Sequence, residues 1–293
     1  MAENKADKQF QLTRKPKNEF EVLVVIPWEE IKKTREKALV EAGQKMEIKG
    51  FRQGKAPANL VAETLGAQRL LETTLQAIVP EYYQKAIKDL KVQPILTPKV
   101  QLVAAKENED WQIKFTSCEE PTVDLSNYKE EIRELKAPEQ IWTPDKAGKE
   151  EKPKGEKEDK EAKLNRLIDW LLKNVKVEVC DLLIEEEVTR RLAELIEQTQ
   201  KLGLTIDQYL NSIGKTVEQI REEYTRSSQA NLALEFILSK IADTEKIAVA
   251  PEEIEKMIAG AKTDEEKRSL EGQKYLLATL IRRQKTLDFL TSL

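Results

Sequence analysis

The segment with the most chemically distinctive side chains is IKGFRQGKAP, which spans residues 48–57. It combines two glycines, one aromatic ring and three basic side chains. Glycines next to a lysine occur in phosphate-binding loops, where successive backbone amides surround a phosphate. An aromatic ring flanked by basic groups instead suits contact with RNA or a ribonucleoprotein surface, because it offers stacking, apolar contact and phosphate pairing together. The spacing of the residues tests the first of these two uses.

That spacing excludes a phosphate-binding loop. Such a loop needs four residues between its glycines, followed by Lys and then Ser or Thr. Gly50 and Gly54 enclose three residues, and Lys55 is followed by Ala56. The segment also follows a helical stretch rather than a strand. A plain turn remains open, in which Phe51 lies in the core and the basic side chains are solvated.

The composition excludes several kinds of catalytic and metal site. The chain has no histidine, which removes Ser-His-Asp and Cys-His chemistry, histidine metal ligands and the commonest general base. Cys118 and Cys180 lie far apart in sequence, so they predict neither a disulfide framework nor a zinc site, and we expect each to be a small buried residue. We therefore expect no catalytic residue, no metal and no cofactor.

Charge and hydropathy are those of a soluble protein that is rich in helix. The formal net charge is -4, yet residues 1–60 hold 13 Lys and Arg against 9 Asp and Glu, a bias that orients this end toward a polyanion without driving strong nonspecific binding. The first ten residues, MAENKADKQF, lack the apolar run of a signal peptide, and no run of 18 apolar residues occurs. We expect a cytosolic protein that does not contact a membrane.

The loop is expected to lie within an α+β domain formed by residues 1–120. FEVLVVI at 20–26 predicts a strand with Phe20, Val22, Val24 and Ile26 on one face, and the run at 28–46 predicts a helix. Pro57 can start a short helix that Gly66 ends in the left-handed conformation. ILTPKVQLVA, whose prolines suit an edge, and the alternating DWQIKFTSC add two strands, giving a small antiparallel sheet covered on one side by helices. Between the short helix that ends at Gly66 and these two strands, a helix over about 68–89 carries an apolar stripe: Leu71, Leu75, Ile78, Val79, Tyr82 and Ile87.

Residues 121–163 are expected to form an extension and a charged linker, since the part from about Lys136 to Lys163 is dominated by Lys and Glu. From residue 164 to 293 the pattern predicts an elongated all-α domain. Two apolar stripes mark its first helices: Leu164, Leu167, Ile168, Leu171, Leu172 and Val175, then Val188, Leu192, Leu195, Ile196 and Leu202. Capping boxes are expected at Thr205 with Gln208, Thr216 with Gln219 and Thr263 with Glu266, and helix ends at Gly214 and Gly260.

The segment GFRQGKAP at 50–57 resembles the GFRxGKxP signature of bacterial trigger factor, a family of ribosome-associated chaperones. The similarity extends over about residues 18–135, through the same order of strand, helix, loop, helices and strands. It resumes in KNVKVEVCDLLIEEEVTRRLAELIEQTQKLG, which resembles the start of the family's C-terminal substrate-binding domain.

This resemblance implies a ribosome-binding loop in which Phe51 and Arg52 make the main contacts and Lys55 supports them. Gln53 stands where relatives commonly carry Lys, so we expect one phosphate contact to be lost and the affinity to be lower. The implied partners are the ribosome near the exit tunnel, through protein and rRNA, and nascent or unfolded polypeptides; a homodimer of the free protein stays open. The full set of implied loop residues is Gly50, Phe51, Arg52, Gln53, Gly54, Lys55 and Pro57.

An isomerase domain of the FKBP type sits between the two matching parts in the family, and here the charged linker takes its place. The resemblance therefore implies a chaperone that is not an enzyme. Two alternatives remain open, namely an RNA-binding module with a helical oligomerisation domain and a trigger factor that retains some peptidyl-prolyl isomerase activity. A periplasmic chaperone with a similar helical core is disfavoured by the polar N-terminus. The apolar residues of the helical part are either packing core or exposed contacts for clients, and the sequence does not separate these roles.

Overall fold

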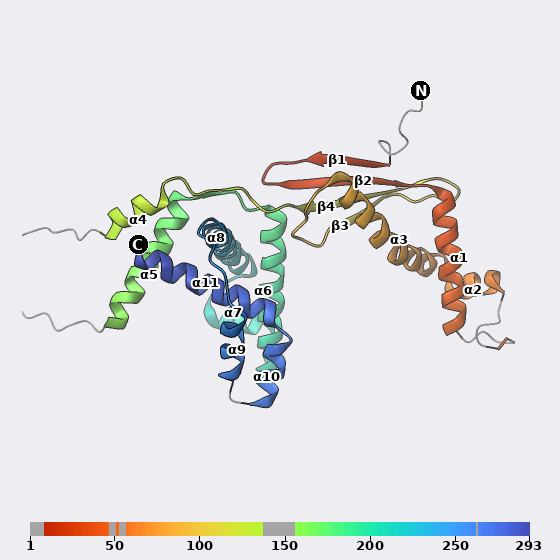
Figure 1. Ribbon diagram of the computed structural model, residues 1–293. Coiled ribbons are helices and arrows are strands. Elements are labelled where there is room, and N and C mark those ends of the chain that lie inside the picture. The colour runs from red at the N-terminus through yellow and green to blue at the C-terminus, as the bar shows by residue number, and fades with distance from the viewer. Residues whose placement is uncertain (1–8, 47–50, 53–56, 137–155, 262) are drawn as a thin grey trace, which may run out of the picture. The chain divides into compact units, whose positions relative to one another are not determined.

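The computed structural model describes residues 9–46, 51–52, 57–136, 156–261 and 263–293 (Figure 1). The chain forms two compact units, residues 1–120 and 121–293. Each unit encloses its own cluster of buried apolar side chains. The α+β and all-α classes predicted from the sequence are both confirmed.

The first unit contains a four-stranded antiparallel sheet. Its strands are β1 (Phe10–Arg14), β2 (Glu19–Ile26), β3 (Lys99–Ala104) and β4 (Trp111–Cys118), in the order β1-β2-β4-β3. The two central strands pair along their whole length, from Glu19 opposite Cys118 to Ile26 opposite Trp111. Because side chains alternate along a strand, the face predicted for β2 is buried as expected: Phe20, Val22, Val24 and Ile26. The sequence analysis missed β1, a short strand with only two apolar residues.

Three helices accompany the sheet: α1 (Trp28–Lys45), α2 (Ala58–Leu65) and α3 (Ala67–Leu90). The stripe predicted for α3 is only half right. Leu71, Leu75, Val79 and Ile87 are half-buried, whereas the row that is fully buried consists of Leu70, Thr74, Ile78, Tyr82 and Ala86. The buried face is broader than the stripe because α1 and α2 pack on α3 in addition to the sheet.

Gly66 separates α2 from α3 in a conformation that the sequence analysis described incorrectly. Its φ of 80° is positive as expected, but its ψ of 154° is extended rather than left-handed helical. Since α3 starts at the very next residue, Ala67, the chain must change direction within one residue. Glycine tolerates this conformation because it has no Cβ.

Residues 121–136 belong to the second unit rather than to a separate extension. They form β5 (Val123–Asp124) and α4 (Tyr128–Lys136), and β5 pairs with β6 (Lys176–Val177). Tyr128 and Ile132 lie in the same buried cluster as Leu171 and Ile237. These short elements were not predicted, because their apolar residues are too few to show a period.

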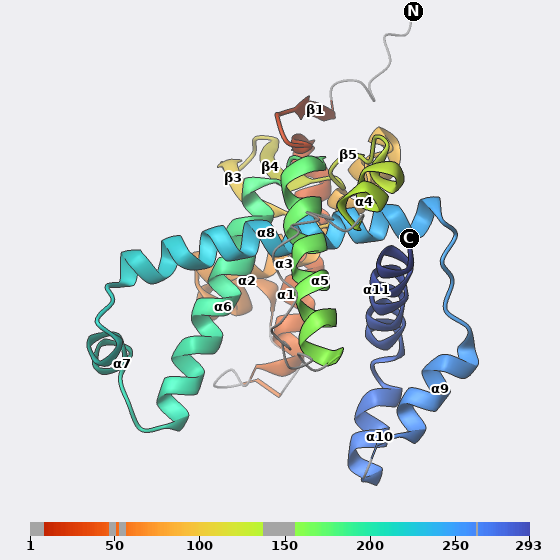
Figure 2. The ribbon, with the colours of Figure 1, turned by 90° about the vertical axis from the view of Figure 1, so that its left-hand side faces the viewer.

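Seven helices make up the rest of the described part of this unit (Figure 2): α5 (Glu156–Asn174), α6 (Asp181–Lys201), α7 (Ile206–Ile213), α8 (Val217–Thr244), α9 (Pro251–Ala259), α10 (Asp264–Glu271) and α11 (Lys274–Ser292). The long helix α8 packs against α5, α6 and α11. Helix α5 begins at Glu156 rather than at Leu164, so the end of the expected linker is helical. The middle of that linker, residues 137–155, lies outside the described residues.

Local signals in the helical unit have mixed outcomes. All three predicted capping boxes form. Gly214 ends α7 in the left-handed conformation, and Gly260 ends α9 in the right-handed one. Leu167, Leu171 and Val175 of the first stripe are buried, but in the second stripe Ile196 and Leu202 are exposed. Both cysteines are buried as predicted.

Candidate functional site

The loop singled out by the sequence connects the end of α1 to the start of α2 (Figure 1). Phe51 is 43% exposed and Arg52 is exposed, so the aromatic ring does not lie in the core. Pro57 is exposed and precedes the first residue of α2, with an extended backbone and a carbonyl that accepts the N–H groups of Leu60 and Val61. The other predicted loop residues lie outside the described residues: Gly50, Gln53, Gly54 and Lys55.

A close contact between α1 and α2 supports the base of this loop. A Cβ added at Gly43 would lie 3.2 Å from Cγ2 of Val61, which is tighter than an ordinary side-chain contact. Val61 is buried, and its β-branched side chain has little rotamer freedom to move away. Gly43 therefore allows the two helices that carry the loop to approach closely.

Two ion pairs lie in the first half of α1, away from the end that leads into the loop. On α1, Lys33 Nζ lies 3.1 Å from Glu30 Oε1, and this hydrogen bond raises the pKa of Lys33. Arg35 Nη1 donates to Glu107 Oε1 at 2.9 Å. Arg52 makes no ion pair with any residue that the structure describes. An exposed guanidinium beside an exposed ring can pair with phosphate and stack on a base or a peptide plane.

Apolar side chains are also exposed on the helical unit, around two groups of helix ends. Around α7, Leu202 is 74% exposed, and it is accompanied by Leu204, Ile213 and Val217. The second group lies on α9 and the first half of α11 and consists of Tyr275, which is 88% exposed, with Met257, Leu276 and Leu280. Among all of these, the sequence analysis named only Leu202, and it placed that residue in a packing stripe. The others lie outside the apolar stripes of the helices or at helix ends. Apolar residues at such positions have no predicted packing partner, and this is the signal that could have identified them as exposed.

A groove of about 470 Å³ runs between α8 and α11 beside the second group. Leu276 and Leu280 line one part of it, while Arg282 and Arg283 supply positive charge. Arg282 is already engaged, since its Nε donates to the Ile247 carbonyl at 2.9 Å and its Nη2 to Asp243 Oδ1 at 2.6 Å. Glu235 also lines the groove, which is thus partly apolar and partly charged, with both signs present.

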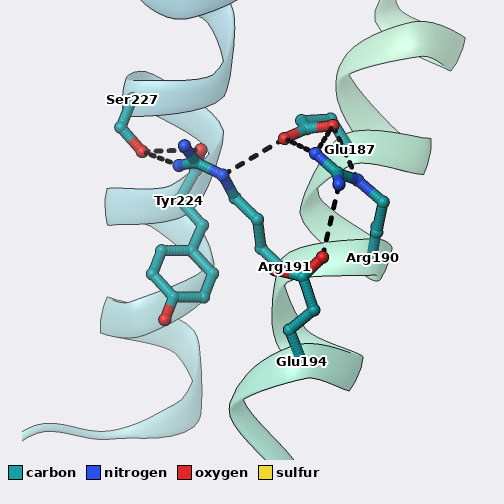
Figure 3. Close-up of polar contacts among 6 residues, drawn as sticks. All are labelled: Glu187, Arg190, Arg191, Glu194, Tyr224 and Ser227. Carbon is teal, nitrogen blue, oxygen red and sulfur yellow. Dashed lines mark hydrogen bonds and ion pairs between the residues drawn. The ribbon is translucent and has the colours of Figure 1, made fainter. Parts of the chain in front are cut away.

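A polar cluster holds α6 against α8 (Figure 3). Arg191 on α6 donates from Nη1 to Ser227 Oγ on α8 at 2.7 Å, and its guanidinium lies 5.8 Å from the centre of the Tyr224 ring. Glu187 accepts from Arg190 Nη2 at 2.7 Å and lies 3.3 Å from Arg191 Nε. The hydrogen bond to Glu187 raises the pKa of Arg190. These contacts hold α6 and α8 together beside the apolar cluster that includes Val188, Leu192 and Tyr224.

A second polar cluster fixes the start of the helical unit. The Tyr128 hydroxyl donates to Glu245 Oε1 at 2.8 Å, and Lys129 Nζ lies 2.7 Å from the same oxygen. Hydrogen bonds from Lys129 and then Tyr128 hold the pKa of Glu245 below its ordinary value. Burial, followed by the hydrogen bond to Glu245, raises the pKa of Tyr128 well above its ordinary value. The segment that leads into the linker is thereby tied to the end of α8.

The described residues contain no group of three or more metal-binding side chains. None of the helices among them is long and apolar enough to cross a membrane. The described residues instead form two exposed surfaces: Phe51 with Arg52 on the first unit, and dispersed apolar side chains on the second. Surfaces of this kind bind macromolecules.

Two family models match the chain, and together they cover almost all of it. Residues 8–151 match the model described as bacterial trigger factor protein, and residues 147–292 match that of the bacterial trigger factor C-terminus. The two matches overlap at 147–151, so no segment between them is left unmatched.

Curated relatives and a solved structure agree with these matches. The chain is 28% identical over 116 residues to the trigger factor of Staphylococcus epidermidis, which covers 40% of this chain and 27% of the relative. It is 34% identical over 112 residues to that of Carboxydothermus hydrogenoformans, covering 38% of this chain and 26% of the relative. The chain thus spans only about a quarter of the length of these relatives.

The similar solved structure comes from a study of promiscuous substrate recognition in the folding and assembly activities of the trigger factor chaperone. It aligns with a TM-score of 0.65 and 18% identity, covering 96% of this chain and 98% of that chain. At this identity the likeness shows a shared fold. Together with the two family models, it leads to one assignment: the chain belongs to the bacterial trigger factor family.

Proposed function

We propose that this protein is a cytoplasmic, ribosome-associated chaperone. Its 50–57 loop docks near the polypeptide exit tunnel, and its helical unit holds unfolded segments as they emerge. The observation that carries the proposal is the exposure of Phe51 and Arg52, side by side in the segment with the family's signature.

Docking through this loop follows from the chemistry of the two side chains. Arginine presents a planar set of donors that matches phosphate, and phenylalanine contributes apolar area at a small entropic cost. Ribosomal surfaces offer both phosphate groups and protein side chains. Gln53 replaces a commonly basic residue in the signature, so we expect tight dependence on Phe51 and Arg52 and a lower total affinity.

Client binding follows from the dispersed apolar surface of the helical unit. A chaperone has to hold many sequences weakly, which calls for exposed apolar side chains on a charged background rather than for one deep pocket. The groups around α7 and along α9 and α11 fit this requirement, with Leu202 and Tyr275 as their most exposed members. The groove between α8 and α11 adds charged side chains of both signs, Arg283 and Glu235, to the second group.

We further propose that the protein has no peptidyl-prolyl isomerase activity of its own. The support is the overlap of the two family matches at 147–151, which leaves no internal segment for a further domain. A refolding assay limited by proline isomerisation tests this, with a known isomerase as the positive control. Catalysis by the purified protein would contradict the proposal.

Cosedimentation with ribosomes tests the docking step. Phe51→Ala/Arg52→Ala/Lys55→Ala is compared with a control that also removes one exposed apolar and two exposed basic side chains from the same unit, Val40→Ala/Arg69→Ala/Lys32→Ala. Loss of an aromatic anchor and a paired arginine typically costs about 2 kcal/mol or more, or roughly thirtyfold in affinity. We expect the loop variant to lose binding and the control to keep it, both with unchanged circular dichroism. Equal binding by the two variants would refute the docking proposal.

A further inference from the structure

The outer edge of β3 carries exposed apolar side chains and has no partner strand in the described part of the chain. β3 is the last strand of the sheet, and β4 is its only partner strand in the described part of the chain. Val100 is 49% exposed and Leu102 is 38% exposed, although their cross-strand partners Phe115 and Ile113 are fully buried. The buried apolar face of the sheet therefore continues past its last strand into solvent.

The opposite edge of the same sheet is different. Phe10 and Leu12 of β1 pack against the buried cluster of the unit, whereas Val100 and Leu102 of β3 are not among the residues packed on it. Native proteins usually blunt or cover a strand edge, because free N–H and C=O groups pair readily with another extended chain. Among the described residues, only the β3 edge combines an outer side that lacks a partner strand with an uncovered apolar row.

We propose that the β3 edge binds an extended segment of unfolded polypeptide, which adds to the sheet as a further strand. This inference rests on the proposed chaperone function and adds a second kind of client contact to it, on the unit that carries the loop. Main-chain hydrogen bonds would give affinity for any sequence, and apolar residues at every second position would face Val100 and Leu102.

The geometry favours a transient client over a second copy of the chain. The register of β3 shifts between Leu102 and Ala104, so β3 pairs regularly with β4 only over residues 99–102. Even six residues of strand span only about 20 Å, and such an edge by itself falls short of the roughly 1,000 Å² that a stable specific interface needs. A bulged, short edge suits weak and reversible capture of an extended chain.

The test uses the full chain and a fluorescein-labelled eight-residue peptide of alternating Thr and Val, measured by fluorescence anisotropy. In an extended strand the N–H and C=O groups of alternate residues point to opposite edges. Two further peptides therefore carry N-methyl groups, one on all Thr residues and the other on all Val residues. Since an added strand uses only one of its edges, we expect one methylated peptide to bind at least tenfold more weakly and the other to bind within twofold of the parent.

A matched pair of variants locates the binding site on the protein. Val100→Glu places a charge in the apolar row, and Gln101→Glu places the same charge on the neighbouring residue, which points to the other face opposite Lys114. We expect Val100→Glu to weaken peptide binding at least fivefold and Gln101→Glu to leave it within twofold. Both side chains are exposed, so neither change should unfold the sheet.

Three results would overturn the inference: no binding of the parent peptide up to millimolar concentration, equal behaviour of the two methylated peptides, or equal effects of the two variants. Self-association in analytical ultracentrifugation that only Val100→Glu abolishes would also overturn it, in favour of a second copy. The ribosome assay separates this outcome from the proposed function. Val100→Glu should cosediment with ribosomes like the wild type, whether or not the β3 edge binds peptides. The docking proposal fails only if the variant that lacks Phe51, Arg52 and Lys55 also cosediments like the wild type.

Discussion

Removing one hydroxyl, in Tyr128→Phe, should loosen α4 from the helical unit. The Tyr128 hydroxyl donates to the Glu245 carboxylate at 2.8 Å, while the ring itself is buried in the core and is retained in the variant. A hydrogen bond to a charged group contributes about 1.5–3 kcal/mol. Because Lys129 remains to pair with Glu245, we expect the lower end, about 1.5 kcal/mol.

Hydrogen–deuterium exchange of the Tyr128–Lys136 segment measures this loss directly. A change of about 1.4 kcal/mol in a local opening equilibrium corresponds to roughly tenfold faster exchange. The matched control is Tyr275→Phe, which removes a hydroxyl from a ring that is almost fully exposed and should leave α4 unchanged. Amides of α3, in the other unit, serve as an internal reference. Exchange of α4 within twofold of the wild type would refute the view that this contact holds the segment.

Three further results are expected. Exchange of α4 in the wild type should approach that of Tyr128→Phe, compared at the same pH, as the pH falls below about 4. The pKa of Glu245 is lowered in the folded protein, so the stabilisation by the ionised carboxylate is present above the unfolded pKa of about 4.3 and is lost when the carboxylate is protonated. Ile237→Ala should destabilise the helical unit by about 2–5 kcal/mol in urea unfolding, whereas Leu202→Ala should change it by less than about 0.5 kcal/mol. Gly214 has a φ of 66°, so Gly214→Ala should lower the free energy of unfolding by about 1 kcal/mol. Gly272 has a φ of −68°, so Gly272→Ala should leave the stability unchanged or raise it, and thermal unfolding of both variants measures the difference.

Local patterns identified most elements correctly, since the forces behind them act between residues close in sequence. Alternation in β2 and β4 and the three threonine capping boxes needed only a window of a few residues. Elements with little local signal were missed, such as β1 and the segment 121–136. The segment 121–136 depends on partners far along the chain, as in the pairing of Tyr128 with Glu245. β1 pairs with the neighbouring strand β2, but its two apolar residues are too few to show a pattern.

The candidate site divides in the same way. The spacing around Phe51 excluded a phosphate-binding loop and identified the family signature, because residue types and their intervals are properties of the chain alone. The sequence left open whether Phe51 lies in the core, and it placed Leu202 in a packing stripe; the structure shows both side chains exposed.

By itself, the sequence determined the order of the longer helices and central strands, the absence of histidine chemistry and the family whose signature the loop carries. Only the tertiary structure decided which apolar residues remain in contact with solvent, among them Phe51, Leu202 and the Val100 row of β3. The physical reason is that burial depends on which distant segments cover a side chain. An apolar stripe on a helix or strand has the same sequence pattern whether another segment packs on it or it is exposed to water.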